Sequence, residues 1–120
     1  GNKMPIIDNK KSFSQALKVM NKKKLGVIVI TKKRFIKGLI TDGDLRRKLN
    51  DYPYKKSLED IVRNNPLTIS ENTPASKALG LMSEKKITSL LVIADKDKNK
   101  KNKRLKGIIH IHFLLQNGIT

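Results

Sequence analysis

The chain has 120 residues, contains no cysteine, and carries 27 Lys and Arg against 10 Asp and Glu, a formal net charge of +17. This length suits one compact module, and the lack of cysteine excludes disulfides, thiolate chemistry and cysteine-based zinc sites. The sequence has no apolar run near the roughly 20 residues of a membrane-spanning helix, and it has no hydrophobic secretory signal. We therefore expect a soluble, cytoplasmic protein that does not bind membranes.

The positive charge attracts polyanions in general. The lysines are spread along the chain among Asn and Ile, and only two Tyr, three Phe and no Trp are present to stack on bases. The composition therefore argues against specific nucleic-acid recognition, while a general polyanion-binding domain stays open as an alternative. The basic segment 95–106 (DKDKNKKNKRLK) is typical of a solvated, mobile loop.

In chain order, the first half predicts a β-α-β-β-α unit. A short strand in 4–7 precedes an amphipathic helix, whose apolar face is formed by Phe13, Ala16, Leu17 and Met20. Two β-branched runs then predict strands over 26–31 and 34–40, and Leu45 and Leu49 begin a short closing helix. Ser12 and Gln15 fit a capping box at the start of the first helix.

The second half repeats this order after a connection over 51–65. A strand in 66–69, a helix over 75–82, strands over 89–94 and 104–110, and a last helix with Leu114 and Leu115 are predicted. Thr73 followed by Pro74 fits an N-cap with proline in the first helical position. Leu17 aligns with Leu79, Met20 with Met82 and Gly38 with Gly107, and the extra residues of the second copy fall in the basic loop, where insertions are tolerated.

The doubled unit, the segment 58–79 (LEDIVRNNPLTISENTPASKAL) and the turn 38–44 (GLITDGD) together resemble a tandem pair of cystathionine-β-synthase (CBS) domains. The resemblance implies an α+β fold, with one CBS motif in 1–52 and the second in 53–120. It also implies that the two copies pack with pseudo-two-fold symmetry around a cleft that binds a regulatory ligand.

Three segments resemble more narrowly the C-terminal regulatory region of arabinose 5-phosphate isomerases of the sugar-isomerase (SIS) class: 38–49 (GLITDGDLRRKL), 84–95 (EKKITSLLVIAD) and 107–120 (GIIHIHFLLQNGIT). CBS pairs of sugar-nucleotide transferases share the TDGDLRR turn, so a transferase parent remains an alternative. The resemblance implies an N-terminal SIS catalytic domain in the full-length bacterial protein and a role in supplying Kdo for lipopolysaccharide. It also implies a homodimer through the CBS pair or a higher oligomer.

The chain itself shows no catalytic machinery. Its two histidines lie two positions apart, no phosphate-cradling glycine-rich loop is present, and no base beside a sugar-phosphate site can be recognised. We therefore expect no catalysis by these residues alone, no required cofactor and no metal site, since two histidines at this spacing are a weak signal.

The turn after the second predicted strand holds the candidate ligand residues. Thr41 and Asp44 have the spacing of a capping box, which would satisfy free N–H groups of a helix that starts at Asp42. The resemblance implies a second role, in which Asp44 accepts hydrogen bonds from ribose hydroxyls and Thr41 lies near a phosphate. Arg46 and Arg47 form either a solvated helix face or phosphate contacts, and Asp42 either lies near the ligand or complements the helix start.

In the second copy, His110 and Phe113 stand where Thr41 and Asp44 stand in the first. A phenyl ring cannot accept hydrogen bonds from ribose, so we expect one nucleotide site and a packing role for Phe113. His110 is expected to make a polar contact in the cleft, and His112 to lie on the surface.

The leading interpretation is an allosteric module that binds AMP, ATP or another adenine or cytidine nucleotide, including CMP-Kdo. A structural dimerisation module without a ligand is the alternative from another class.

Overall fold

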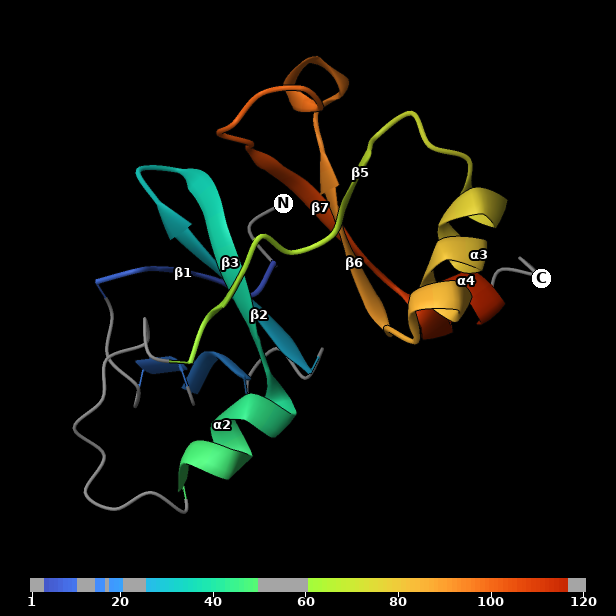
Figure 1. Ribbon diagram of the computed structural model, residues 1–120. Helices are drawn as coiled ribbons and strands as arrows, with labels where there is room; N and C mark the ends of the chain where they lie inside the picture. The colour runs from blue at the N-terminus through green and yellow to red at the C-terminus, as the bar shows by residue number, and fades with distance from the viewer. Residues whose placement is uncertain (1–3, 11–14, 17, 21–25, 50–60, 117–120) are drawn as a thin grey trace. The chain divides into compact units, whose positions relative to one another are not determined.

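The computed structural model describes residues 4–10, 15–16, 18–20, 26–49 and 61–116 (Figure 1). The chain divides into two compact units, Gly1–Pro66 and Leu67–Thr120. Each unit has its own small sheet and helices, so the predicted α+β architecture of two repeated units is confirmed.

The first unit contains a four-stranded sheet in the order β1-β2-β3-β4 (Figure 1). Its strands are β1 (Ile6–Asp8), β2 (Val27–Lys32), β3 (Phe35–Thr41) and β4 (Arg63–Asn64). β1 runs parallel to β2, while β3 is antiparallel to both β2 and β4. Residues 15–16 and 18–20 are helical, and α2 (Asp42–Leu49) follows β3 directly.

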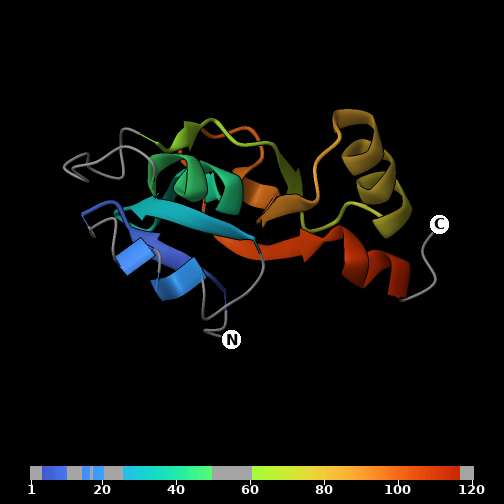
Figure 2. The ribbon, with the colours of Figure 1, turned by 90° about the horizontal axis from the view of Figure 1, so that it is seen from below.

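The second unit repeats this plan with a three-stranded sheet, β5-β6-β7. Its elements are β5 (Thr68–Ser70), α3 (Ala75–Lys85), β6 (Ser89–Ile93), the 3₁₀ turn η2 (Asp95–Asp97), β7 (Leu105–His110) and α4 (Ile111–Gln116). β5 is parallel to β6, and β6 is antiparallel to β7. Figures 1 and 2 show α3 and α4 side by side in this unit.

The two sheets share an irregularity that supports the internal repeat. The antiparallel register shifts between Ile30 and Thr31 in the first unit, and between Val92 and Ile93 in the second. Because Leu17 aligns with Leu79, Ile30 aligns with Val92, so the bulge occupies the same position in both copies. The repeat therefore extends to the details of strand pairing.

Each unit buries its own apolar cluster. In the first unit, the predicted helices and strands supply Ile7, Ala16, Met20, Ile28, Ile30, Ile40 and Leu45, and the segment 51–65, predicted as a connection, supplies Ile61. In the second, the corresponding elements supply Ile69, Ala78, Met82, Leu90 and Leu114. Since full burial of one large aliphatic side chain contributes roughly 1.5–3 kcal/mol, these clusters are the main source of stability for each unit.

The β2–β3 hairpin turns through two residues with positive φ. Lys33 has φ 53° and Arg34 has φ 74°, and both lie in the left-handed region that side chains disfavour. Positive φ at both central residues is the signature of a type I′ turn, whose twist matches the paired strands. The fold therefore imposes this conformation on a Lys-Arg pair that has no intrinsic preference for it.

The structure corrects the predicted N-cap of the second long helix and the predicted mobility of the basic loop, and a third prediction, the Ser12 capping box, lies outside the described residues. Pro74, rather than Thr73, is the N-cap of α3, because its ψ of 145° is extended and the helix begins at Ala75 without a side-chain cap. Ser12 lies outside the described residues. The basic loop has a defined turn, in which buried Asp97 accepts a hydrogen bond from the backbone N–H of Arg104 at 3.2 Å.

Most lysines of this loop are exposed, as expected, while Lys103 is half-buried, and the aspartates of the loop hold it in place. Ser70 Oγ donates to Asp95 Oδ1 at 2.7 Å, and the Asp95 N–H donates to Glu71 Oε2 at 3.0 Å. The hydrogen bond from Arg104 lowers the pKa of Asp97. These bonds join the start of the loop to the end of β5 and to the residue just before β7.

Within the described ranges, no helix is long and apolar enough to cross a membrane. Among those same residues, no group of three or more His, Cys, Asp or Glu side chains is placed to hold a metal ion.

Candidate functional site

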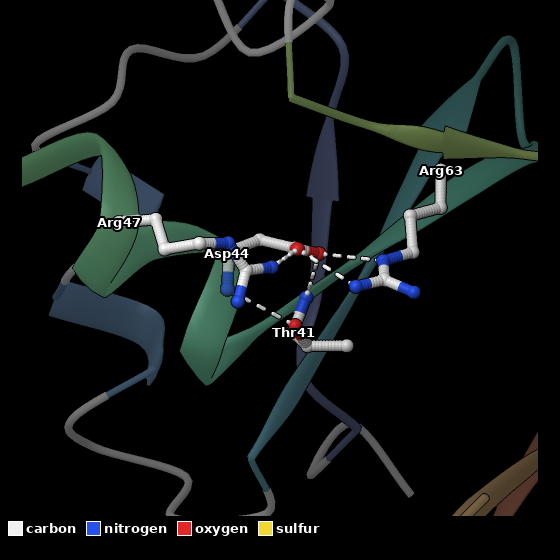
Figure 3. A network of polar contacts seen from close by, with 4 residues as sticks. All are labelled: Thr41, Asp44, Arg47 and Arg63. Atoms are coloured by element: carbon white, nitrogen blue, oxygen red, sulfur yellow. Dashed lines mark hydrogen bonds and ion pairs between the residues drawn. The ribbon is translucent and has the colours of Figure 1, made fainter.

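The site is built where β3 passes into α2. The backbone N–H of Asp44 donates to Thr41 Oγ1 at 3.1 Å, and the backbone N–H of Thr41 donates to Asp44 Oδ2 at 3.0 Å (Figure 3). These reciprocal bonds form a capping box, which satisfies N–H groups that the start of a helix leaves without partners. The capping interpretation of Thr41 and Asp44 is therefore confirmed.

Two arginines also converge on the Asp44 carboxylate (Figure 3). Arg63 Nε donates to Oδ2 at 2.9 Å and Arg63 Nη2 donates to Oδ1 at 3.0 Å, which is a bidentate pairing. Arg47 Nη2 donates to Oδ1 from the next turn of α2. The Asp44 side chain is only 10% exposed, whereas those of Arg47 and Arg63 are 66% and 59% exposed.

The surroundings of Asp44 keep it ionised. Partial burial raises the pKa of this carboxyl, but hydrogen bonds from Arg63 and Thr41 outweigh that effect and hold the pKa at about 2. The same pairing raises the pKa of Arg63. Asp44 is thus a carboxylate at neutral pH with donors on both oxygens, and it is not suited to act as a general base.

Arg63 reaches Asp44 because β4 runs close beside β3. Gly38 pairs with Asn64 and Leu39 pairs with Arg63. A Cβ on Gly38 would lie 2.4 Å from the carbonyl oxygen of Arg63 and 2.4 Å from Val62 Cγ1, so only glycine allows this approach.

The sequence prediction did not include Arg63 in the site. It lies in 51–65, which the prediction treats as a connection, and β4 has only two residues. The available signal was Gly38, because an isolated glycine within a strand indicates close approach of another backbone.

The remaining predicted residues of this turn form an outer ion pair. Arg46 Nη2 lies 2.7 Å from Asp42 Oδ2, and the two side chains are 76% and 37% exposed. Such an exposed helical pair contributes roughly 0.3–0.5 kcal/mol. Together, the guanidinium groups of Arg46, Arg47 and Arg63 face the carboxylates of Asp42 and Asp44, which leaves one excess positive charge at the start of α2.

His110 lies in the second unit. It is half-buried at the end of β7, where it pairs with Ser89. The side chains of His112 and Phe113 lie outside what the structure describes, so the roles expected for them stay predictions. The predicted last helix is present, and within it Leu114 is buried in the second core while Leu115 is 50% exposed.

The groups gathered at this turn are chemically suited to bind an anion. Guanidinium groups are planar, permanently charged donors that match phosphate and carboxylate oxygens bidentately. A helix start adds backbone N–H groups and a partial positive charge. A Cβ on Gly43 would lie 3.4 Å from Arg47 Nη1 and 3.8 Å from Thr41 Oγ1, which is ordinary van der Waals contact, so the fold does not require glycine at this position.

The repeated unit and its capped strand-to-helix turn define the class of protein. The model of the CBS domain family matches residues 2–51 and again residues 58–112. The chain therefore belongs to the CBS domain family and contains a tandem pair of these domains.

Its relatives extend well beyond this pair. An uncharacterized protein of Rickettsia prowazekii is 38% identical over 121 residues, covering 100% of this chain and 36% of that protein. Arabinose 5-phosphate isomerase KdsD of Yersinia pestis is 35% identical over 124 residues, covering 100% of this chain and 35% of that enzyme. The chain thus spans about a third of the length of these curated relatives.

Solved structures agree on the fold. CBSX2, whose crystal structure is in complex with AMP, superposes with a TM-score of 0.79 at 21% identity, covering 97% of this chain and 87% of that chain. This similarity confirms the CBS-pair architecture inferred from the sequence.

Proposed function

We propose that this chain is the regulatory part of a cytoplasmic bacterial sugar-phosphate isomerase that interconverts ribulose 5-phosphate and arabinose 5-phosphate for Kdo and lipopolysaccharide synthesis. A nucleotide or nucleotide sugar binds at the Thr41–Asp44 turn and biases the N-terminal SIS domain. The ligands proposed are AMP, ATP and CMP-Kdo. The similarity to KdsD over the whole chain supports the parent enzyme.

The observation that carries the ligand proposal is the gathering of three arginines at the capped start of α2. Arg46, Arg47 and Arg63 are all more than half exposed, so their guanidinium groups remain accessible to a phosphate. Thr41 adds a hydroxyl and Asp44 a carboxylate within the same turn. The AMP in the CBSX2 complex supports a nucleotide as the ligand class.

The remaining assignments belong to the same proposal. The CBS motifs occupy 1–52 and 53–120, His110 takes part in ligand binding, and the full-length protein is a homodimer or a higher oligomer through the CBS pair. Catalysis resides in the part of the parent enzyme beyond this chain, whose length the relatives indicate.

Calorimetric titration of the chain with AMP, ATP, CMP and CMP-Kdo tests the ligand proposal. One of these should bind with saturable heat, and Arg47→Ala should weaken it by about tenfold, the equivalent of one lost charge-assisted hydrogen bond. Arg34→Ala is the matched control, because it removes the same charge from an exposed hairpin turn.

Absence of binding by all four nucleotides would contradict the regulatory proposal and favour the ligand-free dimerisation module. Equal weakening by Arg34→Ala, with a steep loss of affinity between low and moderate salt, would instead indicate diffuse polyanion binding.

A further inference from the structure

The Asp44 carboxylate has no acceptor position left for a ribose hydroxyl. An ionised carboxylate offers about four lone-pair positions on its two oxygens. Oδ2 accepts the Thr41 N–H at 3.0 Å and Arg63 Nε at 2.9 Å, while Oδ1 accepts Arg63 Nη2 at 3.0 Å and Arg47 Nη2. A hydroxyl that binds this carboxylate must therefore displace one of these donors.

The three residues that donate these four bonds differ in how readily they can be displaced from the carboxylate. The Thr41 N–H belongs to the capping box and is fixed by the backbone. Arg47 and Arg63 are held only by flexible side chains, and both are more than half exposed. The arginines are therefore the groups that a ligand moves, and Arg63 is the one whose two bonds span both carboxylate oxygens.

A neutral hydroxyl is a poor exchange for a guanidinium group. The Arg63 guanidinium gives the Asp44 carboxylate two parallel hydrogen bonds and the attraction of an opposite unit charge, whereas a neutral hydroxyl gives no opposite charge, so a ribose alone gains less from Asp44 than the arginine loses. A phosphate changes the balance, because it accepts the displaced guanidinium fork bidentately. A ligand that carries both groups can take the carboxylate with its ribose and the arginine with its phosphate.

We propose that Arg63 is a specificity-determining residue, which restricts this turn to phosphate-bearing nucleosides by occupying the carboxylate that would otherwise accept an unphosphorylated one. This inference rests on the proposed function, because it concerns the same nucleotide site. It adds to the site a residue outside the TDGD turn. The selection between nucleotide and nucleoside then depends on moving the Arg63 guanidinium from Asp44 to the phosphate, and not on the shape of the ligand.

Paired titrations of AMP against adenosine, and of CMP against cytidine, test the proposal. The unaltered chain should prefer the monophosphate by at least about a hundredfold, equivalent to two charge-assisted hydrogen bonds. In Arg63→Gln, binding of the monophosphate should weaken by about tenfold, while binding of the nucleoside should strengthen, because the carboxylate is freed. A purely structural role for Arg63 would weaken both ligands together.

Two further variants keep the test decisive. Arg63→Lys retains the charge without the planar fork and should give an intermediate preference for the monophosphate. Circular dichroism checks that each variant is folded, and Arg63→Lys replaces Arg63→Gln in the test if the latter is not. Arg46→Gln is the matched control, because Arg46 pairs with Asp42 and not with Asp44: it should weaken only the monophosphate, and the strengthened binding of the nucleoside should be absent.

The inference is overturned if nucleoside and monophosphate bind the unaltered chain equally well, or if both ligands weaken in parallel in Arg63→Gln and Arg63→Lys. The first outcome leaves the proposed nucleotide function intact while removing the role of Arg63. Failure of every nucleotide and nucleoside to bind overturns the proposed function, and this inference with it.

Discussion

At the scale of single residues, the Asp44 carboxylate links local structure to the candidate site. It caps α2 through Thr41, and it accepts hydrogen bonds from Arg47 on the same helix and Arg63 on β4. The turn is thereby joined to a strand that comes later in the chain. Removal of this one side chain should consequently affect both stability and ligand binding.

Stability should depend on pH through Asp44. Its pKa is about 2 in the folded chain against an ordinary value of 3.8, so its contribution is complete above about pH 5 and is lost as the pH falls through 4 towards 2. The contribution should be about 2 kcal/mol of unfolding free energy. Urea denaturation of the unaltered chain and of Asp44→Asn, between pH 2 and pH 6, measures it.

In that experiment, the stabilities of the two chains should converge near pH 2, separate as the pH rises from 2 to 4, and differ by a constant amount above about pH 5. Asp42→Asn is the control, because its exposed pair with Arg46 contributes less than about 1 kcal/mol. A difference between the unaltered chain and Asp44→Asn that stays constant with pH would show that the charge on Asp44 is not what stabilises the fold.

The sequence predicted the local half of this residue network and missed the distant half. Thr41 and Asp44 are three positions apart, so their capping box can be read directly from the chain. Arg63 lies 19 positions beyond Asp44, and its contact depends on the pairing of β3 with β4. A two-residue strand has too little periodicity to be recognised from sequence.

At the scale of elements, the two sheets differ at their aligned glycines. Gly38 lies against the backbone of β4, whereas a Cβ on Gly107 would have no heavy atom within 4 Å. The first position therefore requires glycine for close approach, and the second does not.

Gly38→Ala should push β4 away from β3 and separate Arg63 from Asp44. The added methyl group overlaps with Arg63 and Val62, so we expect a loss of about 1–3 kcal/mol of unfolding free energy. Thermal denaturation measures this loss, and Gly107→Ala, which meets open space, should change stability by less than about 1 kcal/mol. Equal effects of the two substitutions would contradict the proposed role of Gly38.

The β2–β3 hairpin offers an opposite, stabilising change. Replacement of Lys33 and Arg34 by Asn and Gly should stabilise the first unit by about 1–2 kcal/mol, because both positions have positive φ and Asn-Gly suits a type I′ turn. Denaturation by urea measures the gain. An unchanged or lower midpoint would show that the two side chains make contributions that offset the strain.

The elements were largely predictable because their patterns are local. The change from helical to alternating periodicity marked α3 and the strands of both units except β4, and the aligned bulges confirm that the copies share one plan. Pro74 was placed one position too far into the helix, since composition cannot distinguish an N-cap from the first helical residue. The ordered conformation of the loop was not predicted, because a sequence rich in lysines is typical of a solvated loop and does not indicate that Asp95 and Asp97 accept hydrogen bonds from Ser70 and Arg104.

At the scale of the whole molecule, we propose that regulation and catalysis lie in different parts of the parent enzyme. On this proposal, the purified 120-residue chain should not interconvert ribulose 5-phosphate and arabinose 5-phosphate, because it spans only about a third of the length of KdsD. A coupled enzymatic assay measures this directly. Turnover by the purified chain, at a rate proportional to its concentration, would contradict the separation of functions.

The central claim is that a phosphate-bearing nucleotide binds at the Thr41–Asp44 turn through its arginines. Titration of the ¹⁵N-labelled chain with AMP or CMP-Kdo, followed by NMR, tests it most directly. The account predicts saturable chemical-shift changes concentrated in the backbone amides of residues 41–47 and in the side-chain Nε–H of Arg63. The Arg63 signal moves because the guanidinium group exchanges its bond to Asp44 for one to the phosphate. Weak shifts spread over the lysines of the loop 95–106, with the Arg63 Nε–H signal unchanged, would contradict it.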